Sequence, residues 1–192
     1  MIGPEPLQYG QYYHIYNRGN NGETLFRERR NYVYFLNLYD KYIEPIAETY
    51  AYCLMGNHFH FLVRIKDWQS SSSRTSRSFA TLFSTYAKAF NKAYRRTGSL
   101  FEKPFRRKRV DKDRYFTYLI VYIHRNPQRH GLVDDFHDWP HSSYRAMLSD
   151  KVSHIRRLDV LRWFDGRASF EAAHVALVDE GVIEPLITDD RV

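Results

Sequence analysis

The amino-acid sequence predicts an α+β domain, in which an antiparallel sheet carries helices packed on one face. Three observations predict this class. Short aromatic and β-branched segments alternate with longer segments of helical spacing, their order is β-α-β-β-α-(β)-α, and 192 residues suffice for one well-packed core. Hydrophobic residues make up 43% of the chain and aromatic residues 17%, which excludes a disordered chain.

The predicted strands lie in the first half of the chain and near its middle. An aromatic-rich strand runs from 12 to 17 and ends in a Gly/Asn loop. Segments 48–55 and 58–65 are expected to form a hairpin around a Gly-Asn turn. Segment 97–110 is expected to hold a turn and one or two short strands with a basic end.

The first predicted helix covers 27–43. Val33, Leu36, Tyr39 or Asp40, and Ile43 recur in it at helical spacing, and Pro45 ends it. Further helices are expected at 79–96, at 111–126, within 131–148, near 157–164 and near 168–178.

Two segments set limits on these helices. The Ser-rich stretch 66–78 has low complexity and is expected to be a flexible connection. The helix that opens at Asp111 is expected to end near Asn126, because Pro127 cannot donate a backbone hydrogen bond and clashes with the preceding turn.

Cysteine use and hydropathy exclude several classes of protein. Cys53 is the single cysteine, so the chain can form no internal disulfide and no cysteine-based zinc site. No run approaches the roughly 18 apolar residues of a membrane helix, and the N-terminus lacks the pattern of a signal peptide. The sequence therefore indicates a cytoplasmic protein without a membrane partner.

The positive charge is concentrated in the middle of the chain. The formal net charge is +7, but residues 74–114 hold 13 Lys and Arg against three acidic residues, a net charge of +10. The tail 151–192 has a net charge of −2. Such a distribution favours a surface that faces a polyanion such as nucleic acid, although a solvated basic face is the alternative.

The predicted strand 58–65 carries the pattern His58-Phe59-His60. Residues two apart on a strand point to the same face, so the two imidazoles are expected side by side, with Phe59 directed to the other face. Two imidazoles at this spacing can bind one divalent ion and leave positions open for substrate oxygens. A satisfied polar patch without a metal is the alternative.

The predicted helix 111–126 places Tyr115, Tyr118, Tyr122 and Asn126 on one face. A tyrosine held against a phosphate polarised by a metal ion can attack phosphorus and form a phosphotyrosine. Asn126, one turn after Tyr122, can add an oxygen ligand. Core packing is the alternative role for each of these tyrosines.

Several motifs occur in a fixed order between Tyr12 and Tyr144: "YHIYNRG", "AYCLMGNHFHFLV", "GSLFEKPFRRKRV", "YIHRNPQRHGLV" and "DWPHSSY". Together they resemble the IS200-like single-tyrosine transposases of the HUH class, in particular the REP-associated tyrosine transposases. The resemblance implies a ferredoxin-like sheet and divides the chain into a transposase domain, 1–150, and a helical C-terminal extension, 151–192.

The resemblance also implies an activity and a site. In these enzymes a tyrosine cleaves single-stranded DNA near a hairpin and retains the 5′ phosphate, with Mg²⁺ or Mn²⁺ as the ion. The HUH motif corresponds to His58 and His60, and the nucleophile to Tyr122, with Tyr118 as the alternative one turn earlier. The third metal ligand corresponds to Asn126, where related transposases carry Gln.

The basic residues are expected to supply the contacts to DNA phosphates, with only some of the run 106–109 touching the DNA. They are Arg18, Arg95, Arg96, Arg106, Arg107, Lys108 and Arg109. His14 lies on the first strand and is open to a supporting or a structural role. His124 is about 200° round the helix from Tyr122 and is not expected at the metal.

Two other functions stay open, together with the oligomeric state, monomer or homodimer. One is a nucleic-acid-binding protein of the same fold without catalysis. The other is a metal-dependent phosphoesterase that uses water in place of the tyrosine.

Overall fold

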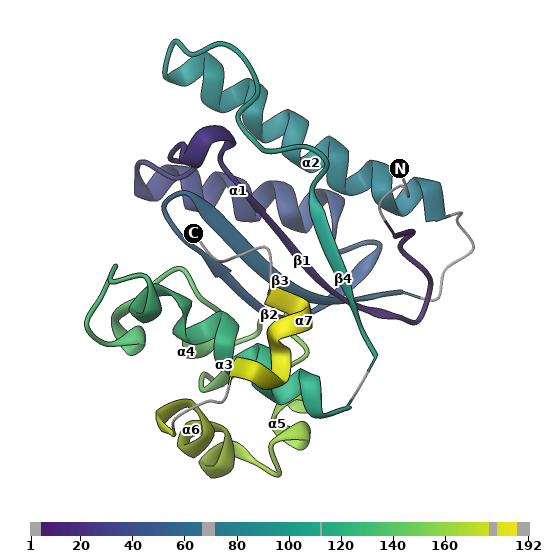
Figure 1. The fold of residues 1–192 in the computed structure, drawn as a ribbon, viewed down its shortest axis with the longest axis vertical. Helices are drawn as coiled ribbons and strands as arrows, with labels where there is room; N and C mark the ends of the chain where they lie inside the picture. The colour runs from purple at the N-terminus through teal and green to yellow at the C-terminus, as the bar shows by residue number, and fades with distance from the viewer. Residues whose placement is uncertain (1–4, 67–71, 112, 177–179, 188–192) are drawn as a thin grey trace.

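A four-stranded antiparallel sheet with the strand order β2-β3-β1-β4 forms the centre of the molecule (Figure 1). The computed structural model describes residues 5–66, 72–111, 113–176 and 180–187. The strands are β1 (Tyr12–Arg18), β2 (Ala47–Leu54), β3 (His58–Ile65) and β4 (Arg106–Val110). The predicted α+β class is confirmed, and the β-α-β-β-α-β order is the expected ferredoxin-like arrangement.

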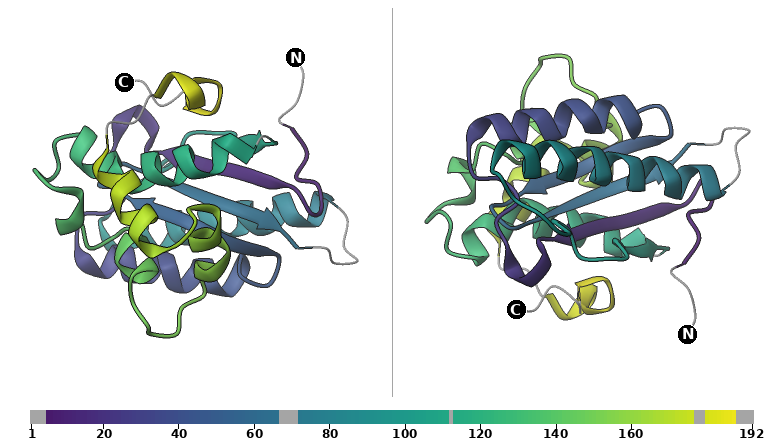
Figure 2. Two further views of the ribbon diagram at one scale, coloured as in Figure 1. Left: turned by 90° about the horizontal axis from the view of Figure 1, so that it is seen from below. Right: turned by 90° about the horizontal axis from the view of Figure 1, so that it is seen from above.

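Helices cover both faces of the sheet (Figure 2). The helices α1 (Arg29–Tyr42) and α2 (Ser72–Ala93) share one face, as expected. On the other face lie α3 (Asp113–Arg129), α5 (Arg157–Trp163) and α6 (Arg167–Val175). The expectation of helices on one face therefore holds for α1 and α2 only. The apolar residues of α3 are buried in a second core on the opposite face of the sheet.

The two cores meet at the alternating side chains of β3. Phe59 and Phe61 point into the core under α1 and α2, where Tyr39 stacks on Phe61 with 4.4 Å between ring centroids. Leu62 points the other way, into the core under α3 with Leu119. Strand β3 is thus buried on both faces and paired on both edges, and its register is fixed.

The remaining elements are short. They are the 3₁₀ helices η1 (Asn20–Gly22), η2 (Phe136–Asp138) and η3 (Glu180–Ile183), and the helices α4 (Tyr144–Met147) and α7 (Glu184–Ile187). The predicted tail helices are confirmed as α5 and α6, which are separated by Asp165 and Gly166 with φ of 57° and 116°. Within the described ranges, no helix combines the length and the apolar character that crossing a bilayer requires.

Helix α2 begins earlier than its prediction. Of the segment expected to be flexible, residues 72–78 are helical, and 67–71 lie outside the described residues. Thr75 and Phe79, one turn apart, are both buried at about 1% exposure. The buried side of α2 therefore extends into the Ser-rich stretch. The low complexity of that stretch led to the prediction of a flexible connection.

The predicted buried face of α1 is confirmed at Tyr39 and Ile43 but not at Val33. Val33 is 49% exposed, while Tyr32 and Phe35 are buried. Phe35 packs on Phe59 with 5.3 Å between ring centroids. Aromatic rings remove more apolar surface from water than valine does, so they decide which side of the helix faces the sheet.

Helix α3 passes through Pro127 and ends at Arg129, so the predicted end near Asn126 is wrong. The last turn is held beyond the proline, since the His130 N–H donates to the Asn126 carbonyl at 3.0 Å. The Leu132 N–H donates to the Pro127 carbonyl at 2.9 Å. One proline so near the helix end removes a single internal bond, and the buried ring contributes packing.

A buried chain of hydrogen bonds fastens the tail to α3. His174 Nδ1 lies 2.7 Å from the Phe170 carbonyl, which can only accept, so Nδ1 carries the proton. His174 Nε2 then accepts from His124 Nδ1 at 2.8 Å, and His124 Nε2 accepts from the Ser143 hydroxyl at 2.6 Å. Both imidazoles must be neutral for this order.

Acid is expected to loosen this attachment. Burial lowers the pKa of His174 from 6.5 to about 4 and the pKa of His124 well below its usual value. The folded state disfavours the protonated imidazoles, so their stabilisation is complete above pH 6.5 and is lost as the pH falls towards 4. We expect the urea midpoint to fall across this window, and to fall less steeply in His174→Gln. An equal pH slope in both proteins would contradict the assignment.

Candidate active site

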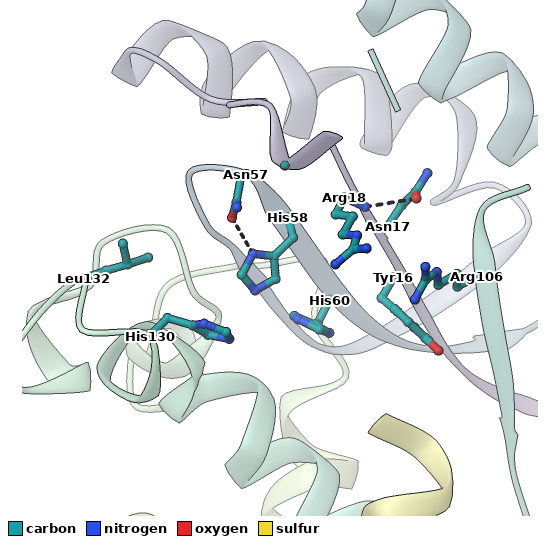
Figure 3. A pocket seen from close by; sticks show the side chains of 10 residues that line it. Tyr16, Asn17, Arg18, Asn57, His58, His60, Arg106, His130 and Leu132 are labelled. Carbon is teal, nitrogen blue, oxygen red and sulfur yellow. Dashed lines mark hydrogen bonds between the residues drawn. The ribbon is translucent and has the colours of Figure 1, made fainter. Parts of the chain in front are cut away.

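A pocket of about 250 Å³ opens where the C-terminal end of β1 lies beside the N-terminal end of β3 (Figure 3). Its lining comes from segments far apart in the sequence, which the sheet and α3 bring together. The lining residues are Tyr16, Asn17, Arg18, Gly22, Asn57, His58, His60, Arg106, His130 and Leu132.

His58 and His60 share one face of β3, as the H-x-H spacing predicts. Their ring centroids are 5.3 Å apart and the rings are perpendicular. Phe59 between them is fully buried on the opposite face. The hydrophobic packing of one side chain therefore fixes the direction of its two neighbours.

Hydrogen bonds orient both imidazoles. His58 Nδ1 lies 2.7 Å from Asn57 Oδ1, an acceptor, so the proton sits on Nδ1 and the Nε2 lone pair is the one directed outward (Figure 3). His60 Nδ1 lies 3.0 Å from His14 Nε2. When His60 donates this bond, its Nε2 likewise becomes the metal-binding nitrogen, and His14 supports it.

Burial keeps both imidazoles neutral. It lowers the pKa of His58 to about 3, with smaller contributions from the positive charge of His130 and Arg18. The pKa of His60 is held well below its usual value, again mainly by burial and then by electrostatic interaction with His14, His58, His130 and Arg129. Neutral imidazole is the form that binds a metal ion.

Tyr122 on α3 lies against the same pair. Its ring centroid is 5.8 Å from that of His60, with the rings nearly perpendicular, and the tyrosine is 2% exposed. The Arg129 guanidinium lies 5.0 Å from the centroid of the Tyr122 ring. The tyrosine, the histidine and the arginine all belong to one chain. Tyr118, the alternative, is half-buried against the apolar core under α3.

Asn126 follows Tyr122 by one turn and is fully buried. Among the described residues, its side-chain oxygen and nitrogen have no hydrogen-bond partner. A buried amide in this state costs roughly 1–3 kcal/mol unless a ligand satisfies it. The side chain therefore fits the role of an oxygen ligand.

The donor set fits a metal ion of intermediate hardness. In the described part of the chain, no three His, Cys, Asp or Glu side chains group around one point. The pocket lining contains the two imidazoles, whereas Asn126 and Tyr122 are buried and are not among the lining residues. Imidazole favours Mn²⁺ over Mg²⁺, which prefers oxygen ligands.

His130 belongs to this site, and the sequence interpretation missed it. Its ring centroid is 4.8 Å from that of His58, and it lines the pocket from the end of α3 (Figure 3). The signal was its spacing, since it follows Tyr122 by eight residues and Asn126 by four. The prediction that the helix ends at Asn126 concealed this.

The basic residues of β4 divide between the two faces of the sheet. The register with β1 directs Arg106 and Lys108 to the face of the pocket, and Arg107 and Arg109 to the face of α1 and α2. The four side chains of this run therefore lie on two different faces.

Ion pairs with two glutamates, Glu102 and Glu23, fix the positions of Arg18, Arg106 and Arg96. Glu102 forms ion pairs with Arg18 and Arg106, and holds both at the rim of the pocket. Glu23 binds Arg96 through two nitrogens and thereby ties the end of α2 to the loop after β1. Arg95 is exposed and adopts a left-handed backbone with φ of 51°.

The fold and the site together define a class: a ferredoxin-like domain whose central strand presents paired histidines to a tyrosine on a helix of the same chain. No family model matches the sequence. The chain is 28% identical over 112 residues to a Haemophilus influenzae protein assigned to the REP-associated tyrosine transposases, covering 55% of this chain. It spans 63% of that relative's length.

A solved structure has the same fold. It is a REP-associated tyrosine transposase bound to a REP hairpin, with a TM-score of 0.64 and 16% sequence identity, covering 78% of this chain and 86% of the other. The chain is thus similar in sequence and in fold to the REP-associated tyrosine transposases, as its motifs indicate.

Removing the Asn126 amide is expected to weaken metal binding without unfolding the protein. Asn126→Ala deletes a buried group that has no partner among the described residues, so the metal-free melting temperature should change little. Mn²⁺ binding, measured by titration calorimetry, should weaken at least about tenfold. Asn126→Asp should bind Mn²⁺ more tightly and be less stable without it.

Gln128→Ala, two residues further along α3, is the matched control and should bind Mn²⁺ like the native chain. Equal affinities of Asn126→Ala and Gln128→Ala would exclude Asn126 as a ligand.

Proposed function

We propose that this protein is a single-tyrosine DNA transposase. It cleaves and rejoins single-stranded DNA beside a hairpin through a 5′-phosphotyrosine at Tyr122. The observation that carries the proposal is the position of the Tyr122 ring, 5.8 Å from the ring of His60 on the paired-histidine strand. The alternative, in which the histidines form a polar patch without a metal, gives no reason for a buried tyrosine to pack against them.

The ion in this proposal is Mg²⁺ or Mn²⁺, held by His58, His60 and Asn126. When bound, it supplies positive charge that orients the scissile phosphate and stabilises its transition state. The neutral imidazoles and the buried amide support this assignment.

The chain's own residues carry the chemical step. The Tyr122 oxygen forms a bond to phosphorus as the bond from phosphorus to the 3′ oxygen breaks. The phenolic proton passes to solvent, and the leaving 3′ oxygen takes up a proton. Because the phosphotyrosine is itself a phosphodiester, a 3′ hydroxyl can reverse the step and join a strand without ATP.

Positive side chains around the pocket hold the DNA backbone. Arg18 and Arg106 stand at the rim, and two guanidinium groups share the single carboxylate of Glu102, so net positive charge remains for phosphates. Arg129 adds positive charge at the Tyr122 ring. A hairpin partner is supported by the related transposase that was solved with a REP hairpin.

His58, His60 and Tyr122 lie together within one chain, so we propose that Tyr122 acts on DNA bound by its own subunit. Residues 151–192 serve in this proposal as an extension that braces α3. The buried bond between His174 and His124 supports it, because His124 lies two residues from Tyr122.

The nucleophile assignment predicts a covalent adduct. The native chain, incubated with Mn²⁺ and a 3′-labelled single-stranded hairpin substrate, should carry the label in a denaturing protein gel, since the 5′ phosphate of the labelled fragment stays on the protein. Tyr122→Phe should abolish the labelled band, while Tyr118→Phe should retain it. An adduct in Tyr122→Phe would refute the assignment.

A native chain that binds the hairpin but never forms the adduct would favour the non-catalytic DNA-binding protein. Hairpin cleavage without an adduct would favour the water-using phosphoesterase.

The different positions of Arg106 and Arg96 predict different effects of their substitution on DNA binding. Arg106→Ala should weaken hairpin binding and reduce the slope of log affinity against log salt by about one, as expected for one lost phosphate contact. Arg96→Ala should lower the melting temperature, because it breaks the bond to Glu23, and should leave the salt slope unchanged. Fluorescence anisotropy at several salt concentrations measures the slope. Equal slopes for both variants would contradict this division.

A further inference from the structure

A second, larger hollow lies on the other side of the sheet edge. It is a groove of about 830 Å³ between α2 and the segment 98–107, within the range of roughly 300–1,000 Å³ typical of sites that enclose a small ligand. Its floor is apolar and aromatic, formed by Phe83, Phe101 and Phe105.

The rim of the groove is basic. Arg77, Lys88, Lys103 and Arg107 line it, against Glu102 alone among acidic residues in that lining. Glu102 is already engaged by two arginines of the active-site pocket. An apolar floor with a cationic rim suits a ligand with flat rings and negative charge between them.

Phe105 and Arg107 already form a stacking pair. The Arg107 guanidinium lies 4.2 Å from the centroid of the Phe105 ring, and its Nη1 donates to the Ser76 hydroxyl at 2.9 Å. Its Nε is buried and has no partner among the described residues. A nucleotide can supply both a ring for the stack and oxygens for the guanidinium.

The groove and the active-site pocket have neighbouring linings. Asn17 lines both. A third hollow of about 410 Å³ follows β4 and shares Tyr16 and Arg106 with the pocket, and Phe105 and Arg107 with the groove. Strand β4 is the edge of the sheet, so a DNA strand can pass over it from one face of the sheet to the other.

We propose that the single-stranded DNA next to the scissile phosphate crosses the edge strand β4 and seats an unpaired base in the groove between α2 and residues 98–107. Phe105 and Arg107 contact the base, and Arg77 and Lys88 contact the adjoining phosphates. This inference rests on the proposed function, whose site supplies the other end of the path. A hairpin stem stays outside, because the groove admits single nucleotides and not a duplex.

The binding test compares two DNA probes: a short hairpin with single-stranded thymidine flanks on both sides, and the same hairpin without flanks. The flanks should tighten binding to the native chain about tenfold, and Arg77→Glu with Lys88→Glu should remove this gain. Lys41→Glu is the matched control, an exposed lysine on α1 outside the groove, and should keep it. Flanks that add no affinity, or a gain that survives in the double variant, would overturn the proposal.

A cross-linking test locates the base independently of activity. 5-Iodouracil replaces one thymidine of the flanks at a time, and the irradiated complex is digested for mass spectrometry. One position should cross-link to Phe105, and Phe105→Leu should lose that product while binding the flankless hairpin normally. If no position cross-links to the groove, the base lies elsewhere.

The two proposals fail separately. A covalent adduct at Tyr122 without a cross-link in the groove refutes the DNA path and leaves the transposase assignment standing. A cross-link at Phe105 without an adduct retains the path as a single-strand binding surface and refutes the catalytic proposal.

Discussion

The alternation of side chains along β3 is the constraint on which the site depends. This strand is paired on both edges, so its residues cannot change register without breaking two ladders. Phe59 and Phe61 are committed to the core under α1 and α2, and that commitment directs His58 and His60 to the opposite face. A site built on an inner strand is positioned more accurately than one on a loop.

Helix α3 meets these histidines with buried side chains, and Tyr122 is itself part of the core under α3. Tyr122, Asn126 and His130 recur at four-residue spacing, so they follow one stripe of the helix. His124 points away and is held by Ser143 and His174. The helix is thus fixed from behind by buried hydrogen bonds, and its position relative to β3 does not depend on the pocket itself.

Local patterns predicted the strands, the tail helices and the facing of the two histidines, because each depends on residues close in sequence. The predicted burial of Val33 on α1 and the predicted start of α2 were wrong, because tertiary contacts with an aromatic core decide which residues are buried. The end of α3 was wrong because the packing of Pro127 outweighs one lost bond. Spacing alone could not bring Tyr122 to His60. The family resemblance supplied that expectation. Counting charges along the sequence could not predict that Glu102 and Glu23 pair with particular arginines.

The alternation of side chains that directs the residues of β3 also divides the basic residues of β4 between the two faces of the sheet. Four successive basic residues on a strand cannot face one surface, so two lie on the side of the histidines and two on the side of α2. On an inner strand such a run would bury charge on both faces. On the edge strand β4 it produces a cationic border that can be reached from either side. In the proposed DNA path, a single strand that leaves the pocket would therefore meet basic side chains on both faces of this edge.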